Sequence, residues 1–173
     1  MDRKVGSMMP LADCRILLIG IGFYDYEAAI AKQFRTLGAD VWVENEQPPE
    51  DRGRLAPLRR LLATRSDAAT ARHLHALRMR ARAMGCLDVI ILIKGMGLDE
   101  EFLHGMRADH PGVRLIVYHW DSMSRFPYLR ERLNWYDRVL TFDHADAASD
   151  TRFILRPNFY RPEFITRSAA PAP

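Results

Sequence analysis

The fold of this 173-residue chain is decided by the stretch DVIILIKG, residues 88–95. Its five central residues are all aliphatic, so a strand made from them is apolar on both faces. Strands of this kind belong to parallel sheets, in which helices cover both faces. Shorter runs with the same character predict further strands at residues 15–20, 41–43, 113–118, 138–142 and 153–155.

Amphipathic segments between these strands predict helices. Apolar residues recur at helical spacing from Tyr26 to Leu37, after a predicted N-cap at Asp25. Asp99 and Asp143 are predicted to cap two later helices, and Pro127 suits the first turn of another. The expected helices cover residues 26–37, 55–63, 68–84, 100–110, 127–136 and 143–149.

Alternation of strands with helices predicts the fold class α/β. Right-handed crossovers then give a doubly wound, mostly parallel six-stranded Rossmann-like sheet with helices on both faces. We expect a flexible N-terminus at residues 1–12, one domain at residues 13–165 and a disordered tail at residues 166–173.

The composition excludes several classes of protein. With 48% hydrophobic and 27% charged residues, the chain is neither disordered, collagen-like nor a coiled coil. No apolar run reaches the roughly 18 residues of a membrane helix, and no secretory signal is visible, which predicts a cytoplasmic protein. Cys14 and Cys86 are too few for a disulfide framework or a structural zinc site, and we expect buried thiols. The histidines lack metal-ligand spacing, so no metal is predicted.

Positive charge is concentrated in residues 52–82, which hold nine arginines and one acid. Such a segment is compatible with nucleic acid, anionic lipid or a phosphate-bearing ligand. A solvated helix face is the favoured explanation. The segment contains no aromatic residue, so it lacks a stacking platform for single-stranded nucleic acid.

Polar residues and glycines follow four of the predicted strands. Because the carboxyl ends of parallel strands share one edge of the sheet, we expect these residues to form a ligand site. The predicted ligand-binding residues are Gly20, Gly22, Tyr24, Lys94, Gly95, Trp120, Ser122 and Asp143. Asp121 and His119 are the predicted catalytic pair, since Asp can deprotonate a hydroxyl and His can share a proton near neutral pH.

Structural roles compete with these assignments. Gly20 and Gly22 begin a dinucleotide fingerprint, but Asp25 replaces its third glycine and would repel a pyrophosphate. The two glycines can instead permit a tight turn. Trp120 can pack on a neighbouring helix, and Asp143 is a stronger candidate for a helix cap than for a catalyst.

Four strings of sequence resemble those of a known family. They are DVIILIKG at residues 88–95, YHWDS at 118–122, YDRVLTFD at 136–143 followed by Asp146, and RPNFY at 156–160. Together they resemble bacterial capsular- and lipopolysaccharide-biosynthesis proteins of the glycosyltransferase-like type, over residues 14–165. The resemblance implies the amino-terminal half of a two-domain GT-B enzyme that transfers a sugar from a nucleotide-sugar donor to a glycan. Asn158 stands where that family more usually has Leu.

The resemblance also implies partners. A sugar or glycan acceptor would bind this half, and a partner subunit would supply the donor-binding half. No cofactor is expected, since a nucleotide-sugar donor requires the second domain. The arginine-rich segment would place the protein in the cytoplasm, peripheral to the inner membrane, against an anionic membrane surface. The sequence leaves open whether the protein forms a homo-oligomer. The alternative is a non-catalytic binding or assembly module, or a truncated remnant, and nucleic-acid binding ranks last.

Overall fold

The computed structural model describes residues 9–48 and 67–159, and it confirms the predicted α/β fold. Six strands form one sheet in which every neighbouring pair is parallel, in the order β2-β1-β3-β4-β5-β6. Their bounds are β1 Arg15–Gly20, β2 Asp40–Asn45, β3 Val89–Ile93, β4 Arg114–His119, β5 Arg138–Thr141 and β6 Phe153–Leu155. The strand order reverses between β1 and β3, the position at which open sheets of this type bind ligands.

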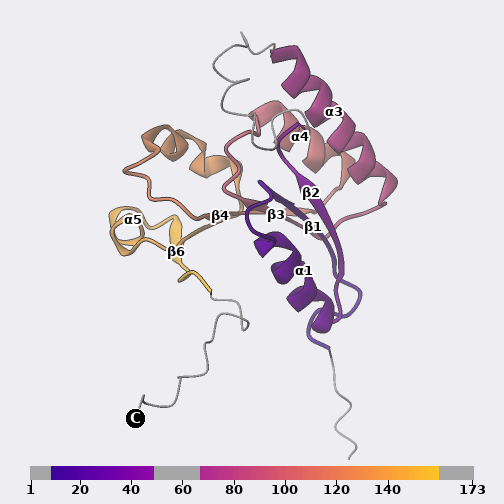
Figure 1. The fold of residues 1–173 in the computed structure, drawn as a ribbon, viewed down its shortest axis with the longest axis horizontal. Helices are drawn as coiled ribbons and strands as arrows, with labels where there is room; N and C mark the ends of the chain where they lie inside the picture. The colour runs from indigo at the N-terminus through magenta and orange to yellow at the C-terminus, as the bar shows by residue number, and fades with distance from the viewer. Residues whose placement is uncertain (1–8, 49–66, 160–173) are drawn as a thin grey trace, which may run out of the picture.

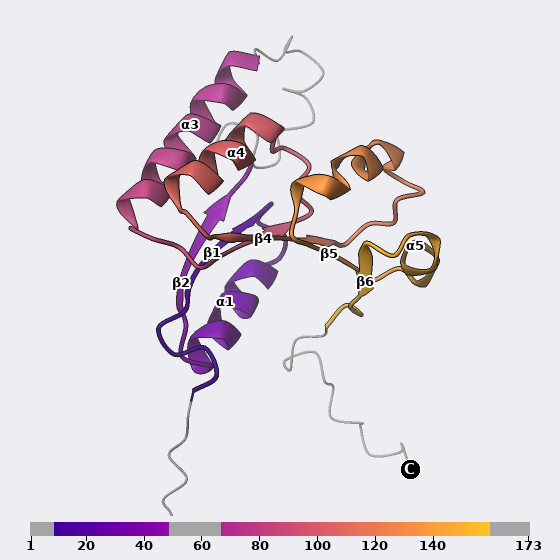
Figure 2. The ribbon, with the colours of Figure 1, turned by 180° about the vertical axis from the view of Figure 1, so that it is seen from behind.

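Helices lie on both faces of the sheet, as Figures 1 and 2 show. On one face lies α1, Tyr26–Thr36. On the other, α3, Asp67–Ala83, packs beside α4, Glu100–Asp109. A short helix, α5, His144–Ser149, connects β5 to β6. The helix predicted at residues 55–63, the first eight residues and the tail at residues 166–173 lie outside the described residues.

The segment that begins at Pro127 differs from the predicted helix. It is the 3₁₀ element η2, Pro127–Trp135, and the chain is extended by Tyr136. Leu129 and Leu133 are buried beneath it. Arg132 donates from Nη1 to the carbonyl oxygens of Met96 and Leu98, at 3.3 and 3.2 Å. These anchors hold a short connection close to the sheet, where the tighter winding of a 3₁₀ helix is common.

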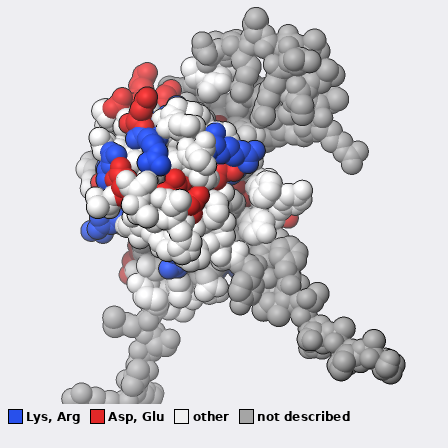
Figure 3. Space-filling model, turned by 90° about the vertical axis from the view of Figure 1, so that its left-hand side faces the viewer, with Lys and Arg blue, Asp and Glu red and all other residues white. Residues whose placement is uncertain are grey.

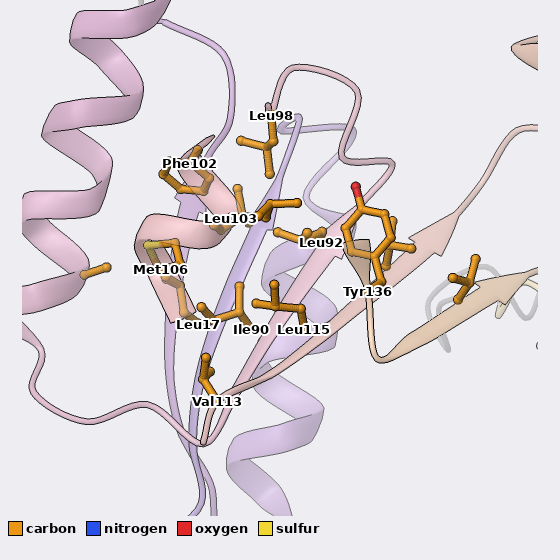
Figure 4. Close-up of a cluster of buried hydrophobic side chains, with 14 of the residues drawn as sticks. Leu17, Ile90, Leu92, Leu98, Phe102, Leu103, Met106, Val113, Leu115 and Tyr136 are labelled. Carbon is orange, nitrogen blue, oxygen red and sulfur yellow. The ribbon is translucent and has the colours of Figure 1, made fainter. Parts of the chain in front are cut away.

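The larger hydrophobic core lies between the sheet and the α3–α4 layer (Figure 4). Phe102, Leu103 and Met106 of α4 point from the helix toward strand residues such as Leu17 and Leu115. Each is at most 5% exposed. Burying one such side chain stabilises a protein by about 1.5–3 kcal/mol, so these contacts hold α4 against the sheet.

Three of the four arginines of α3 are paired with acids. Arg78 Nε lies 2.5 Å from Asp109 Oδ2 at the end of α4, and Arg82 lies 3.7 Å from the same carboxylate. Arg80 makes two hydrogen bonds of 2.8 Å to Glu44 of β2. The described part of the arginine-rich segment therefore fastens α3 to its neighbours. Residues 52–66 of that segment lie outside the described residues.

The thiols are not both buried as predicted. Cys86 is exposed and Cys14 is half-buried, because both stand in loops that precede strands rather than in the strands themselves. Burial still raises the pKa of the Cys14 thiol, with a smaller contribution from the nearby Asp88 carboxylate. None of the helices that the structure describes is both long and apolar enough to cross a membrane.

Candidate functional site

A pocket of about 440 Å³ opens at the carboxyl edge of the sheet. It draws on the loop after β1, the start of α1, the loops after β3 and β4, and the segment after β6. Three of the predicted site residues, Lys94, Trp120 and Asp121, therefore meet in one place. The full lining is Phe23, Tyr26, Lys94, Trp120, Asp121, Arg125, Asn158 and Phe159.

Aromatic rings from three separate segments form one wall of this pocket. The Tyr26 ring lies 5.8 Å from Trp120 and 5.6 Å from Phe159, measured between ring centroids and edge to face in both cases. Trp120 and Phe159 are 6.5 Å apart. Such edge-to-face contacts are favourable in themselves, so the wall is a packed unit. It joins α1, the loop after β4 and the segment after β6.

The segment after β6 is held in place by Tyr118. This hydroxyl lies 3.1 Å from the carbonyl oxygens of Arg156 and Pro157 and from the side-chain oxygen of Asn158. Burial raises the pKa of Tyr118, so its hydroxyl remains a hydrogen-bond donor. The position of Asn158 and Phe159 in the pocket thus depends on a buried side chain of β4.

Opposite charges occupy the other side of the pocket. Lys94 Nζ lies 2.5 Å from Asp121 Oδ2, and Arg125 Nη1 lies 3.0 Å from Asp121 Oδ1. The Asp121 side chain is only 15% exposed, whereas Arg125 is 71% exposed. Two cations share one carboxylate here, so the group has an excess of one positive charge.

Lys94 has a strained backbone. Its φ is 69°, and Gly95 follows with a φ of 63°, so two successive residues are left-handed. This conformation costs a non-glycine residue roughly 1–2 kcal/mol. A hydrogen bond of 3.0 Å from Lys94 N to the carbonyl oxygen of Tyr118 helps to hold it. Strain of this kind is concentrated at ligand-binding sites.

His119 does not face the pocket, although Trp120 and Asp121 beside it do. Adjacent side chains of a strand point to opposite faces, so His119 lies on the α4 side while Tyr118 lies on the α1 side. His119 is 3% exposed. Burial lowers its pKa to about 4, an effect that the Asp121 carboxylate opposes only in part. The ring is therefore neutral at pH 7, with no hydrogen-bond partner for Nε2.

Gly20 and Gly22 surround an internal carboxylate. Glu27 Oε1 accepts hydrogen bonds from the backbone N–H groups of Ile21 and Gly22, at 3.0 Å each, and from Phe23 at 3.4 Å. A Cβ on Gly20 would lie 2.5 Å from Glu27 Cγ. The amide groups that could bind a phosphate are thus already occupied by the protein itself.

Asp25 stands at the N-cap position of α1, as predicted, but it does not cap the helix with its side chain. Its backbone is left-handed, with a φ of 59°, and its side chain makes no cap hydrogen bond. Glu27 binds the amides of the loop before the helix and does not replace this cap. Asp99 and Asp143 do cap their helices, as predicted: Asp99 accepts from Phe102 N at 2.7 Å, and Asp143 from Ala145 N at 2.7 Å.

The remaining predicted site residues lie outside the pocket lining. Tyr24 is 75% exposed and packs edge to face on Phe23, 4.6 Å between centroids. Ser122 shares a hydrogen bond of 2.9 Å with Ser124. Its hydrogen bond to Asp143 is also the largest cause of the lowered pKa of that carboxyl. Gly95 supports the turn that positions Lys94.

A second buried acid lies near the carboxyl edge. Glu46 is 3% exposed, and its Oε1 accepts a hydrogen bond of 3.2 Å from Gly97 N. Burial raises its pKa to about 7, against the opposing effects of that hydrogen bond and of Lys94 and Arg132. Glu46 is therefore held by the loop after β3. Within the described ranges, no three His, Cys, Asp or Glu side chains come together as metal ligands.

Five lining residues are not among the predicted site residues: Phe23, Tyr26, Arg125, Asn158 and Phe159. Tyr26 was assigned only to a helix, and Asn158 and Phe159 only to a family-like string. Arg125 carried a usable signal, because it stands four residues after Asp121 and could pair with it. The aromatic wall had no local signal, since its rings come from parts of the chain more than 30 residues apart.

No protein-family model matches this chain, and no curated protein matches it. Two solved structures are similar. A putative pilus assembly protein, CpaE, from Burkholderia thailandensis is 16% identical, over 75% of this chain and 85% of that one, with a TM-score of 0.42. A putative pilus assembly-related protein from Burkholderia pseudomallei is also 16% identical, over 78% and 85%, with a TM-score of 0.37.

The predicted identification as a glycosyltransferase-like protein of polysaccharide biosynthesis is wrong. The similar solved structures are pilus-assembly proteins, and no family model supports the resemblance. The strings that carried it have structural explanations. Residues 89–93 form the central strand β3, Asp143 caps α5, and Asp137 accepts a hydrogen bond of 2.7 Å from Leu115 N. A parallel α/β sheet requires such features whatever it binds.

Proposed function

We propose that this protein is a non-catalytic binding module whose pocket at the carboxyl edge holds a small ring-shaped anion. One observation carries the proposal: an aromatic wall stands beside a Lys94–Asp121–Arg125 group with one surplus positive charge. Pockets for small molecules commonly combine apolar ring surfaces with a few polar groups that fix the orientation of the ligand. The volume of about 440 Å³ suits a ligand of that size.

The ionic group supports binding rather than acid–base catalysis. Both oxygens of Asp121 lie beside cations, at 2.5 and 3.0 Å, so neither is free to take a proton from a hydroxyl. His119 lies behind the pocket and is neutral at pH 7. Asp121 is better placed to orient Lys94 and Arg125 toward an anion. The predicted catalytic roles of Asp121 and His119 stay predictions.

The loop after β1 restricts how the anionic group of a ligand can be bound. A phosphate usually binds to the free amide groups of such a loop. Here Glu27 occupies those groups and repels an anion from them. The anionic group of a ligand must therefore be bound by side chains, with Arg125 the more accessible of the two cations. A planar carboxylate suits the guanidinium group well.

Three pairs of compounds test this proposal: glucuronate with glucose, benzoate with benzyl alcohol, and uridine monophosphate with uridine. They separate a sugar, an aromatic acid and a nucleotide as the source of the ring, while each pair isolates the anion. Binding is followed through the Trp120 indole N–H signal in NMR titrations. We expect at least one anion to bind about tenfold more tightly than its neutral partner, since a charge-assisted hydrogen bond contributes roughly 1.5–3 kcal/mol.

Variants of the lining provide the control. Arg125→Gln should remove most of the preference for the anion, and Trp120→Ala should abolish binding because the wall loses its central ring. Arg72→Gln removes the same charge from an exposed position on α3 and should leave affinity unchanged. Equal binding of the anionic and neutral members of every pair, or an Arg125→Gln protein with unaltered affinity, contradicts the proposal.

A further inference from the structure

One half of the sheet has no described helix over it on the α1 side. In Figures 1 and 2, α1 lies against the part of the sheet made by β1, β2 and β3, while α3, α4 and η2 are on the opposite side. No described helix lies under β5 and β6 on the α1 side. All-parallel sheets are found almost only with both faces covered, so this half-face is an incomplete surface.

Apolar residues line this half-face in register. Tyr118 of β4 pairs with Leu140 of β5, which pairs with Ile154 of β6, and these three side chains point to the same side. Ile116 belongs to the same face, two residues before Tyr118. Ile154 is 43% exposed, and Ile116 and Leu140 are half-buried. Neither Ile116 nor Ile154 belongs to the two hydrophobic cores.

Three arginines border the apolar row. By the alternation of side chains, Arg114, Arg138 and Arg156 lie on the same face as Ile116, Leu140 and Ile154. All three are exposed. Within the described part of the chain none of them has an acidic partner, whereas Arg78 and Arg80 on the other side of the sheet are paired. Figure 3 shows a mixture of both charges on the neighbouring side of the molecule, near α5.

We propose that this half-face, defined by Ile116, Leu140, Ile154 and the three bordering arginines, binds an amphipathic helix with acidic borders from another protein. The apolar row matches the apolar stripe of such a helix, and the arginines match its acids. The proposal does not depend on the pocket. A strand of six residues such as β4 spans about 20 Å, which a helix of about 14 residues covers.

Charge complementarity selects a foreign helix over this chain itself. The described helices present no acidic stripe: Glu27 and Asp146 are buried, and Glu100 and Glu101 share the first turn of α4. The sequences of residues 1–8, 49–66 and 160–173 each contain more Lys and Arg than Asp and Glu. A second copy of this chain therefore offers a poorer match to the arginines than an acidic partner does.

Two synthetic helical peptides of about 14 residues test the proposal. Both carry the same leucine stripe, one bordered by glutamates and the other by lysines. Fluorescence anisotropy measures their affinity for the full chain, and methyl NMR signals of Ile116, Leu140 and Ile154 locate the contact. We expect the glutamate peptide to bind about tenfold more tightly and to shift all three signals, with a preference that declines as salt is added.

Charge reversal completes the test. In the Arg114→Glu, Arg138→Glu double variant the preference should invert, so that the lysine peptide binds better. Arg72→Glu should retain the preference of the wild-type protein, because it makes the same charge change in α3, on the opposite side of the sheet. A double variant that still prefers the glutamate peptide overturns the proposal. So does a dimer in sedimentation experiments that Ile154→Gln disrupts, because a second copy then covers the face.

Discussion

Glu27 and Gly22 are joined by a hydrogen bond of 3.0 Å from the glycine N–H to the carboxylate, inside the turn that links β1 to α1. The same oxygen accepts the N–H of Ile21. In many α/β proteins an anionic ligand occupies this position. Here a side chain of the protein closes the turn, so the carboxyl edge must bind its ligand farther along the sheet, beside Lys94 and Trp120.

Replacement of Glu27 should destabilise the protein. Glu27→Ala leaves buried N–H groups without an acceptor, and we expect the free energy of unfolding to decrease by about 3 kcal/mol. Urea denaturation at pH 7 measures the change, with Lys32→Ala on the exposed side of α1 as the control. In the variant, sulfate should restore part of the loss by binding to the vacated amides. A Glu27→Ala protein as stable as the wild type would show that water replaces the carboxylate without loss.

Gly20 is required by the same contact. An added Cβ at this position lies 2.5 Å from Glu27 Cγ and 2.8 Å from its Cδ. Gly20→Ala should therefore displace the carboxylate and decrease the free energy of unfolding by about 2–3 kcal/mol, in the range known for overpacked sites. The double variant with Glu27→Ala should be no less stable than Glu27→Ala alone. Additive effects in this double-mutant cycle would mean that the two residues act independently.

Much of the fold could be predicted because short, continuous apolar runs in the sequence indicate buried strands. The aliphatic run at residues 89–93 and its shorter counterparts predict the sheet, and the shared edge of parallel strands places Lys94 near Trp120 and Asp121. The sequence-based prediction also placed His119 in the site. The sequence does not show at which residue a strand ends, so it does not show that His119 still belongs to β4 and points to the other face of the sheet.

The rest of the site depends on long-range packing. Phe159 reaches the pocket because the Tyr118 hydroxyl holds the chain after β6 against α1. No local spacing encodes that contact. Glu27 was missed for a different reason, since an acid in the first turn of a helix is ordinarily explained by the helix dipole alone. Only the distance from its carboxylate to the loop amides shows that it fills an anion site.

Glu46 should make the protein less stable as the pH rises. Its pKa in the folded protein is about 7, against an ordinary value of 4.5, because burial disfavours the charged carboxylate. Between these values the folded chain retains a proton that the unfolded chain has lost, so the free energy of unfolding decreases as the pH increases through that window. The full effect is about 3 kcal/mol. Glu46→Gln should remove this loss and be more stable than the wild type at pH 8.

Urea denaturation at pH 5 and pH 8 measures the Glu46 effect. The matched control is Glu131→Gln, which alters an exposed carboxylate of η2 and should reproduce the wild-type difference between the two pH values. The Gln side chain keeps an oxygen for the Gly97 N–H, so the variant isolates the charge from the hydrogen bond. If Glu46→Gln and the wild type change equally between the two pH values, Glu46 does not bind the proton.

His119 should make the protein less stable as the pH falls, which is the opposite of the effect of Glu46. Burial lowers its pKa to about 4 from an ordinary value of 6.5, so the unfolded chain binds a proton that the folded chain does not. Stability from this source is complete above pH 6.5 and is lost as the pH decreases toward 4. Between pH 4.5 and 6.5 the two residues therefore oppose each other, while the buried His110, whose pKa is also lowered by burial, acts in the same direction as His119.

Single variants should separate the opposing effects of Glu46 and His119 on the slope of stability against pH. His119→Leu removes the loss of stability that His119 causes in acid, so relative to the wild type its stability should rise as the pH falls from 6.5 to 4.5. Glu46→Gln should change the slope in the opposite direction, and in the double variant the two changes should largely cancel relative to the wild type. The slopes of unfolding free energy against pH decide the matter, because they do not depend on how much each substitution destabilises the core. Parallel slopes in the two single variants would mean that neither buried group controls the acid response.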